Sequence, residues 1–133
     1  MNKLNEKVAY WMTLADYDIE TAKAMLNSGR FLYVGFMCHQ TIEKAFKAAI
    51  SRYCTDGEIP PKIHDLSKLA VRARLFDLLS EKQQDFVDEL NPLNVEARYP
   101  EYKDVVSSGL TKEACVKLIA GTEELLCWIK ERL

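Results

Sequence analysis

The sequence predicts an all-α fold, with four or five helices packed in one bundle. Apolar residues recur at steps of three and four near both ends of the chain, which is the spacing of an amphipathic helix. No segment alternates polar and apolar residues between hairpin turns, as half-buried strands do. The 133 residues suit one domain, 1–133, and only 5 Gly and 4 Pro are present, so few positions are committed to turns.

The first two helices are predicted from this periodicity and from the glycine that separates them. Over residues 3–28, one helical face carries Leu4, Val8, Trp11, Ala15, Ile19, Ala22 and Leu26. Gly29 follows at the position where helices commonly end on a left-handed residue. A second helix is predicted from Phe31 to about Tyr53, before a loop that contains an Asp-Gly and a Pro-Pro pair.

The later elements are marked by capping residues. Asp65 can cap the free amides of a third, shorter helix. Residues 80–83, Ser-Glu-Lys-Gln, have the pattern of a capping box for a fourth helix, which Pro92 ends or breaks. Residues 94–110 form the longest irregular stretch, and a fifth helix is predicted from about Thr111 onward.

The charge balance and the cysteine pattern argue against several classes of function. A formal net charge of -2 and a pI of about 5.7 disfavour a broad phosphate-binding surface, although a local basic patch is still allowed. None of the four cysteines forms a CxxC pair, so a zinc site is not expected. Three of them, Cys38, Cys115 and Cys127, lie in apolar helical patterns. We expect these three to be buried free thiols, as in proteins of a reducing compartment.

The same patterns predict a cytoplasmic protein without a metal or a cofactor. No apolar run is long enough to cross a bilayer, and the N-terminus lacks the apolar stretch of a signal peptide. No contact with a membrane is therefore expected. Asp16 and Asp18 are two positions apart on a predicted helix, so they point to different faces and do not form a metal pair.

The predicted second helix carries a polar stripe. At about 100° per residue, one side of this helix holds Gln40, Glu43, Lys44, Lys47 and Ser51. The pattern alone favours a solvated stripe, with a Glu43–Lys47 pair worth a few tenths of a kcal/mol. His39 falls at the apolar edge of the same helix, where a satisfied core histidine is more common than a catalytic one.

Longer sequence words carry a resemblance to a known family. The chain resembles the HEPN domain family in four ordered runs, "LADYDIETAKAML", "YVGFMCHQTIEKAFKAAI", "IHDLSKL" and "ARYPEY" before a last long helix. The ordered trio of Gln-x-x-Glu-Lys, His-Asp-Leu and Arg-Tyr-Pro is the specific part. The resemblance implies an up-and-down helical bundle with an additional short helix. It also implies a homodimer with a cleft where the two copies meet.

The resemblance leaves the activity divided among functional groups. Many members of the family are ribonucleases, often toxins, with an arginine followed after four to six residues by a histidine. Others bind nucleotides or RNA without cutting, and many stand beside a small nucleotidyltransferase. In this chain no histidine follows Arg98, and none occurs after His64. RNA cleavage without a metal needs a group that exchanges protons near neutral pH beside a cation. Arg98 supplies only the cation, so the nuclease motif is not carried over.

Five candidate ligand-binding residues follow from the resemblance and from side-chain chemistry. Arg98 can bind a phosphate bidentately, Tyr99 can stack on a base, and His64 can contact a ligand at a helix start. Lys44 and Lys47 could extend such a surface. Each residue also has a structural alternative, namely a salt bridge for the arginine, core packing for the tyrosine, local capping for the histidine and solvation for the lysines.

Four residues of the second helix are expected to join this site. We expect His39, Gln40, Glu43 and Lys47 to lie beside the Arg-Tyr-Pro segment, in one copy or across the dimer, and to line one polar cleft. Glu43 would orient a basic group there rather than touch an anionic ligand, because two negative charges at close range repel.

Two functions from different classes follow. The first is a homodimeric binding and interaction module that holds a nucleotide or an RNA phosphate near Arg98. It would pair with a small nucleotidyltransferase in a toxin–antitoxin-like system. The alternative is a metal-independent ribonuclease with a rearranged site that uses His39 or His64. The missing arginine-to-histidine motif favours the first function. A third possibility is a helical scaffold that binds no ligand.

Overall fold

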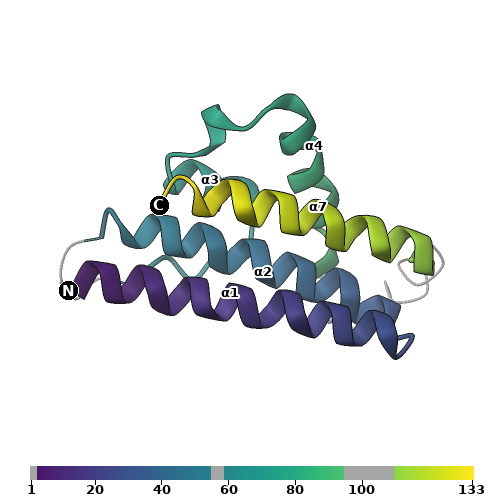
Figure 1. The fold of residues 1–133 in the computed structure, drawn as a ribbon. Coiled ribbons are helices and arrows are strands. Elements are labelled where there is room, and N and C mark those ends of the chain that lie inside the picture. Colours follow the sequence, from purple (N-terminus) through teal and green to yellow (C-terminus); the bar gives the residue numbers. More distant parts are fainter. Residues whose placement is uncertain (1–2, 55–58, 95–109) are drawn as a thin grey trace.

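The chain folds into a helical bundle, described in this computed structural model for residues 3–54, 59–94 and 110–133. Within these ranges the elements are helices and turns, with no strand (Figure 1). The bounds are α1 (Lys3–Asn27), α2 (Phe31–Ser51), α3 (Leu66–Arg72), the 3-10 helix η1 (Phe76–Leu78), α4 (Glu81–Leu90) and α7 (Lys112–Lys130). The predicted all-α bundle with a short additional helix is confirmed, and η1 is an element that the sequence patterns did not predict.

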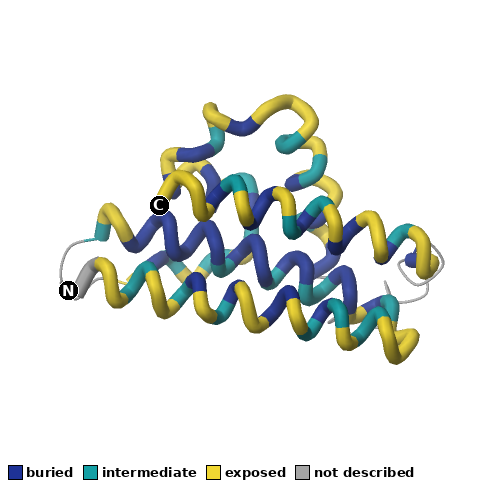
Figure 2. Tube along the Cα trace, in the orientation of Figure 1, coloured by how far each residue is buried: buried dark blue, intermediate teal, exposed yellow. Residues whose placement is uncertain are grey.

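Helix α2 occupies the centre of the bundle. It packs along α1 on one side and along α7 on another, while α3 and α4 cover part of its remaining surface. Figure 2 shows that α2 is buried along most of its length, whereas α1 and α7 each expose one face. The largest fully buried side chain, Phe46, lies on α2. Because several neighbours surround this one helix, polar residues on it are easily taken out of water.

The helix starts are capped by side chains. The Asp65 carboxylate accepts a hydrogen bond from the Lys68 amide, as predicted. Ser80 and Gln83 form the predicted capping box at the start of α4. Thr111 caps α7. Each cap satisfies amide groups that have no partner inside the helix.

Two helix ends share one backbone motif but differ in the residue at its left-handed position. At the end of α1, the Arg30 amide donates to the Met25 carbonyl, and Gly29 has φ 75°. At the end of α3, the Leu75 amide donates in the same way to the Ala70 carbonyl, but the left-handed residue is Arg74, with φ 62°. Glycine adopts this conformation freely, whereas a residue with a Cβ is strained there by about 1 kcal/mol.

The burial of the cysteines differs from the prediction at one position. Cys38 and Cys115 are buried free thiols, as expected, whereas Cys127 on α7 is exposed. Its neighbours Leu125 and Leu126 face the core, and at about 100° per residue the next position turns out toward solvent. Burial raises the pKa of the Cys38 thiol to about 12.

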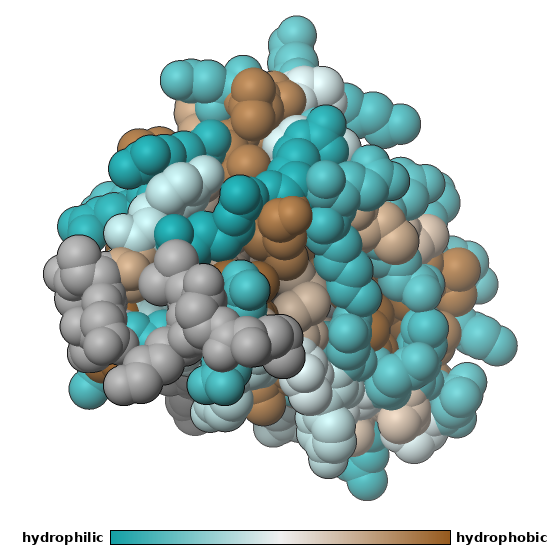
Figure 3. Space-filling view, turned by 60° about the vertical axis from the view of Figure 1, so that its left-hand side comes forward, coloured by the Kyte–Doolittle hydropathy of each residue, from teal (hydrophilic) through white to brown (hydrophobic). Residues whose placement is uncertain are grey.

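The face of the molecule at the end where α1 begins and α7 ends is mostly polar. Figure 3 brings this end of the bundle forward. Hydrophilic side chains cover most of that face, with smaller hydrophobic patches between them. Among the described residues, no helix combines the length and the apolar character that crossing a bilayer requires.

Candidate functional site

A buried carboxylate on α2, that of Glu43, holds two basic side chains. Its Oε2 atom lies 3.1 Å from the Lys47 Nζ, and its Oε1 atom lies 3.0 Å from the His64 Nδ1. Glu43 is only 4% exposed and Lys47 only 7%, so these charges are removed from water. The Lys47 ammonium also lies 5.6 Å from the centre of the Trp11 ring, where the ring face attracts a cation. We call Glu43, Lys47 and His64 the Glu43 cluster.

The local fold explains why these three residues meet. Glu43 and Lys47 are four positions apart on α2 and therefore lie on the same face one turn apart. His64 comes from the segment before α3, which the Asp65 cap fixes in place. The expected solvated stripe is therefore wrong at Glu43, Lys47 and Ser51, all of which are buried. The Ser51 hydroxyl donates to the Lys47 carbonyl instead of meeting water.

His39 lies beside the cluster but further inside. Its side chain is fully buried, and its Nδ1 atom lies 3.7 Å from the Glu43 Oε1. The sequence pattern favoured a core histidine at this position, and the ring is in the core. This position fits the interpretation of His39 as a core histidine and keeps it away from a ligand in solvent.

His64 also lines a pocket at the surface. The pocket has a volume of about 440 Å³ and is lined by His64, Asp65, Asp88, Asn91, Pro92 and Asn94. The Asn91 Oδ1 accepts a hydrogen bond from the Leu66 amide at 2.9 Å, and the Asn94 Oδ1 accepts one from Gln40 at 3.4 Å. Both oxygens are used, and within the described ranges neither amide nitrogen donates a hydrogen bond, so the amide hydrogens of each asparagine can serve another partner.

The contact with Glu43 fixes the orientation of the His64 ring. An ionised carboxylate only accepts hydrogen bonds, so the hydrogen is placed on the Nδ1 atom of His64. In the neutral ring, Nε2 then carries the lone pair and can accept a hydrogen bond or a proton. The His64 side chain is 49% exposed, so this half of the ring is accessible from the pocket side.

The other predicted site residues are placed differently. Lys44 pairs with Asp18 of α1, a buried carboxylate, and does not contact the Glu43 cluster. Gln40 reaches the pocket indirectly, through its hydrogen bond to Asn94. Arg98 and Tyr99 lie outside the described residues. The structure thus brings His64, Glu43, Lys47 and His39 together.

Sequence reasoning missed Asn91, Asn94 and Asp88. Pro92 was interpreted only as a helix end, and the two asparagines beside this proline carried no separate signal. Their spacing around a helix C-terminus could have suggested hydrogen bonding to a neighbouring segment, because asparagine is common where backbone groups need partners. Trp11 was assigned to the apolar face of α1, and its contact with a buried ammonium was not foreseen.

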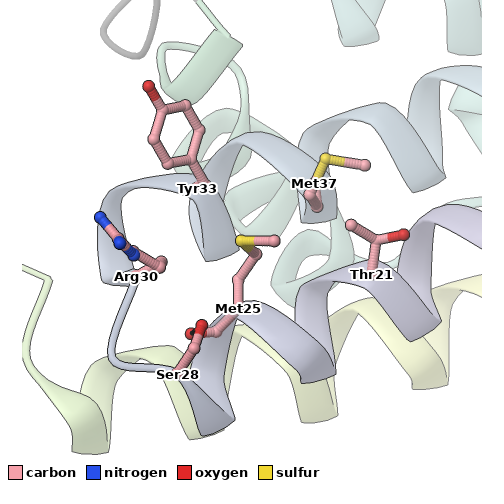
Figure 4. Close-up of a pocket in the computed structure, with 6 residues that line it drawn as sticks. All are labelled: Thr21, Met25, Ser28, Arg30, Tyr33 and Met37. Atoms are coloured by element: carbon pink, nitrogen blue, oxygen red, sulfur yellow. Dashed lines mark hydrogen bonds between the residues drawn. The ribbon is translucent and has the colours of Figure 1, made fainter.

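A second pocket, of about 430 Å³, lies between the end of α1 and the start of α2 and is lined by Thr21, Met25, Ser28, Arg30, Tyr33 and Met37. Figure 4 shows Met25 rising from α1 toward α2, with Arg30 and Tyr33 beside the turn that joins the helices. Arg30 is the one charged side chain among the described residues that line this pocket, and they form no ion pair with one another. In the described part of the chain, no group of three or more His, Cys, Asp or Glu residues is placed to hold a metal ion.

Comparison with known proteins agrees with this architecture. The crystal structure of TT1696 from Thermus thermophilus superposes with a TM-score of 0.77 at 18% identity, covering 96% of this chain and 98% of that one. This likeness concerns the fold alone. No curated protein matches the chain. The family model for the HEPN domain matches residues 8–133, which is nearly the whole sequence. The chain therefore belongs to the HEPN domain family.

Proposed function

We propose that this chain is a nucleotide- or RNA-phosphate-binding and interaction module whose ligand site is the pocket beside His64. The observation that carries the proposal is the burial of the Glu43 cluster directly behind that pocket. Taking charges out of water costs several kcal/mol per ion before pairing offsets it. A protein that needed only packing here could use apolar residues at the same positions, so the cluster is better explained by a role in the pocket.

The chemistry of the pocket suits part of a nucleotide. Free amide hydrogens on Asn91 and Asn94 can donate to base or ribose oxygens, and the carboxylate of Asp88 can accept from an exocyclic amino group or a hydroxyl. His64, held by Glu43, offers a donor or an acceptor at Nε2. The phosphate itself needs a cation, and Arg98 follows Asn94 by four residues in the sequence.

Lys44 is not retained in this proposal as a phosphate ligand. Its ammonium is already paired with the buried Asp18, and freeing it would leave that carboxylate without its charge partner. Lys47 is likewise held by Glu43 and has little exposed surface. Lys47 would therefore contribute to ligand binding by orienting Glu43 and His64 rather than by contacting the ligand.

The partners proposed are a second copy of the chain and a small nucleotidyltransferase. Both follow from the family resemblance, in which such pairs act as toxin–antitoxin-like systems. A pull-down from native extract, analysed for protein and for nucleic acid, tests the second partner. Recovery of a small nucleotidyltransferase supports the pairing, and recovery of nucleic acid with no such enzyme contradicts it.

The binding site is tested by titrating the purified protein with ATP and, separately, with a short single-stranded RNA. Wild type is compared with His64→Ala and Arg98→Ala, and with Arg30→Ala as a matched control in the turn between α1 and α2. We expect each of the first two changes to weaken ATP binding about tenfold, the typical value of one hydrogen bond to a charged group. Binding should also weaken as salt rises.

The control decides whether a loss is specific. Arg30→Ala removes one positive charge, as Arg98→Ala does, but it lies outside the pocket and should leave ATP binding unchanged. If neither ATP nor RNA binds the wild type below millimolar concentration, the proposal fails, and the Glu43 cluster is then a structural feature only.

The orientation of His64 favours one second candidate, a metal-independent ribonuclease. A carboxylate that fixes Nδ1 and leaves Nε2 accessible is the arrangement that makes histidine a general base. We expect no useful RNA cleavage by the isolated protein, because the nuclease motif is absent. Cleavage of single-stranded RNA without metal, lost in His64→Ala and reduced in Glu43→Gln, would instead establish this second function.

A further inference from the structure

A group of arginines and aromatic rings lies at the end of the bundle where α2 and α7 finish, on the left of Figure 1. It consists of Arg52, Tyr53, Arg74, Trp128 and Arg132, and we call it the arginine–aromatic cluster. The Arg52 guanidinium donates to the Arg132 carbonyl, which ties the end of α2 to the end of α7. Residues from three separate elements of the chain therefore meet at one surface.

Two of the three guanidinium groups in the cluster lie directly against an aromatic ring, and the third lies further from one. The Arg74 Cζ atom is 4.0 Å from the Tyr53 ring centre, and the Arg52 Cζ atom is 5.9 Å from the same ring. The Arg132 Cζ atom is 3.8 Å from the Trp128 ring centre. Distances near 4 Å are those of direct contact between a cation and a ring face. Tyr53 is nevertheless 44% exposed, so the stack is open to solvent.

The three arginines differ in how far they are already occupied. Arg132 donates to the Trp128 carbonyl and lies 3.8 Å from the Glu131 carboxylate, and Arg52 donates to the Arg132 carbonyl. Arg74 has neither a hydrogen bond nor an ion pair from its guanidinium among the described residues. Its five N–H donors are therefore available to a ligand while its position is held by the Tyr53 ring.

The backbone of Arg74 supplies an independent observation. Arg74 occupies the left-handed position of the motif that ends α3, and Gly29 occupies the same position at the end of α1. Glycine would relieve the strain at residue 74 at no cost in hydrogen bonds. Strained residues persist only where the surrounding structure holds them, and they are concentrated at functional sites. The arginine is therefore better explained by what its side chain binds than by the stability of the turn.

We propose that the arginine–aromatic cluster is a binding surface for single-stranded RNA. A guanidinium held on a ring can donate bidentately to a phosphate, and both its plane and an exposed tyrosine can stack on bases. An acidic protein segment would use the charges but not the flat faces. The cluster brings three guanidinium groups together, and among the described residues Arg132 is the one of them that forms an ion pair, with the neighbouring Glu131. Guanidinium groups of this kind can bind the phosphate backbone.

This surface is separate from the pocket of the proposed function. His64 lies just before α3, and Arg74 lies just after it, so the two sites occupy opposite ends of that helix. RNA binding at the cluster does not require a nucleotide in the pocket. ATP is the ligand that reports on the pocket alone, so Arg74→Gly should leave ATP binding unchanged while His64→Ala weakens it. The two proposals can therefore fail independently of each other.

The test uses Arg74→Gly, a variant that removes the side chain and relieves the backbone strain. A fluorescently labelled single-stranded RNA of about twelve nucleotides is titrated with the full chain over a range of salt concentrations. We expect RNA affinity to fall about fivefold to tenfold and the slope of log affinity against log salt to shrink by about 0.7, the share of one phosphate contact. Thermal stability should not fall, and ATP binding should stay unchanged.

Two controls make the result decisive. Arg30→Ala removes the same charge at the other end of the bundle and should leave RNA affinity within twofold of the wild type. Arg74→Lys keeps the charge but loses the planar fork, so it should bind RNA between Arg74→Gly and the wild type. Polyglutamate should compete poorly with RNA.

Three results would overturn the proposal. One is an Arg74→Gly variant that binds RNA as the wild type does. Another is an equal loss in Arg30→Ala, which would mean that binding follows net charge alone. The third is polyglutamate that competes as well as RNA, which would assign the surface to acidic protein segments. A loss of ATP binding in His64→Ala alone bears on the pocket and leaves this surface untouched.

Discussion

The buried ion pair between Glu43 and Lys47 predicts a large loss of stability when one partner is removed. The test variant is Lys47→Met, which keeps an unbranched apolar stem of similar length and a similar helix propensity. The stem can still pack against Trp11, so the change removes mainly the ammonium. Glu43 then keeps its contact with the basic ring of His64.

The expected magnitude follows from burial. Glu43 and Lys47 are 4% and 7% exposed, so water cannot replace the lost partner without opening the structure. Breaking a buried pair by removing one ion typically costs about 3–5 kcal/mol, and we expect about 3 kcal/mol here because His64 stays in contact with Glu43. For a chain of this size the midpoint of thermal unfolding should fall by about 12 °C.

Urea unfolding followed by circular dichroism measures the difference. The control is the double variant Glu43→Gln with Lys47→Met, which removes both charges while the glutamine amide can still meet His64. It should recover most of the loss, because no uncompensated charge is left inside. If Lys47→Met lies within about 0.5 kcal/mol of the wild type, the value expected of an exposed pair, the description of a desolvated cluster is wrong.

Three further predictions concern packing, a buried thiol and assembly. In Gly121→Ala, the new Cβ would lie 2.6 Å from the nearest Phe86 ring carbon. In urea unfolding, overpacking should outweigh the gain in helix propensity and lower the stability of the fold by about 1 kcal/mol. In a Phe86→Leu background the same change should raise the stability. The raised pKa of Cys38, about 12, means that the unfolded thiol ionises first. Stability should therefore be lost as pH rises from about 9 toward 12, by about 1.4 kcal/mol per unit, and a Cys38→Ala variant should lack this loss in urea unfolding at each pH. Light scattering at micromolar concentration should give twice the mass of one chain, and a monomer mass would contradict the proposed homodimer.

Most of the fold could be predicted from local sequence signals. Asp65 and the Ser80–Gln83 pair act through amides no more than three residues away, so their roles are visible without a tertiary structure. Gly29 ends α1 for a reason that lies in its own backbone. Arg74 shows the limit, because an arginine gives no sign in the sequence of a left-handed conformation.

The candidate site was harder to predict because it depends on contacts between distant segments. A helical projection separates a polar stripe from an apolar one, but it does not show that the segment leading into α3 contacts Glu43. His64 was identified through the family resemblance, whereas its contact with Glu43 spans 21 residues. Lys44 and Asp18 are 26 residues apart, and no periodicity within either helix links them.

The proposed binding function depends most on His64 being the residue through which the pocket meets its ligand. The chain contains two histidines, and His39, fully buried, serves as an internal reference for the ring signals in a proton NMR spectrum. Spectra are recorded while ATP is added to the 133-residue chain, with His64→Gln used to assign the signals. The His64 signal should move in a saturable way below millimolar ATP while the His39 signal stays in place. ATP binding that leaves the His64 signal unmoved would contradict the account.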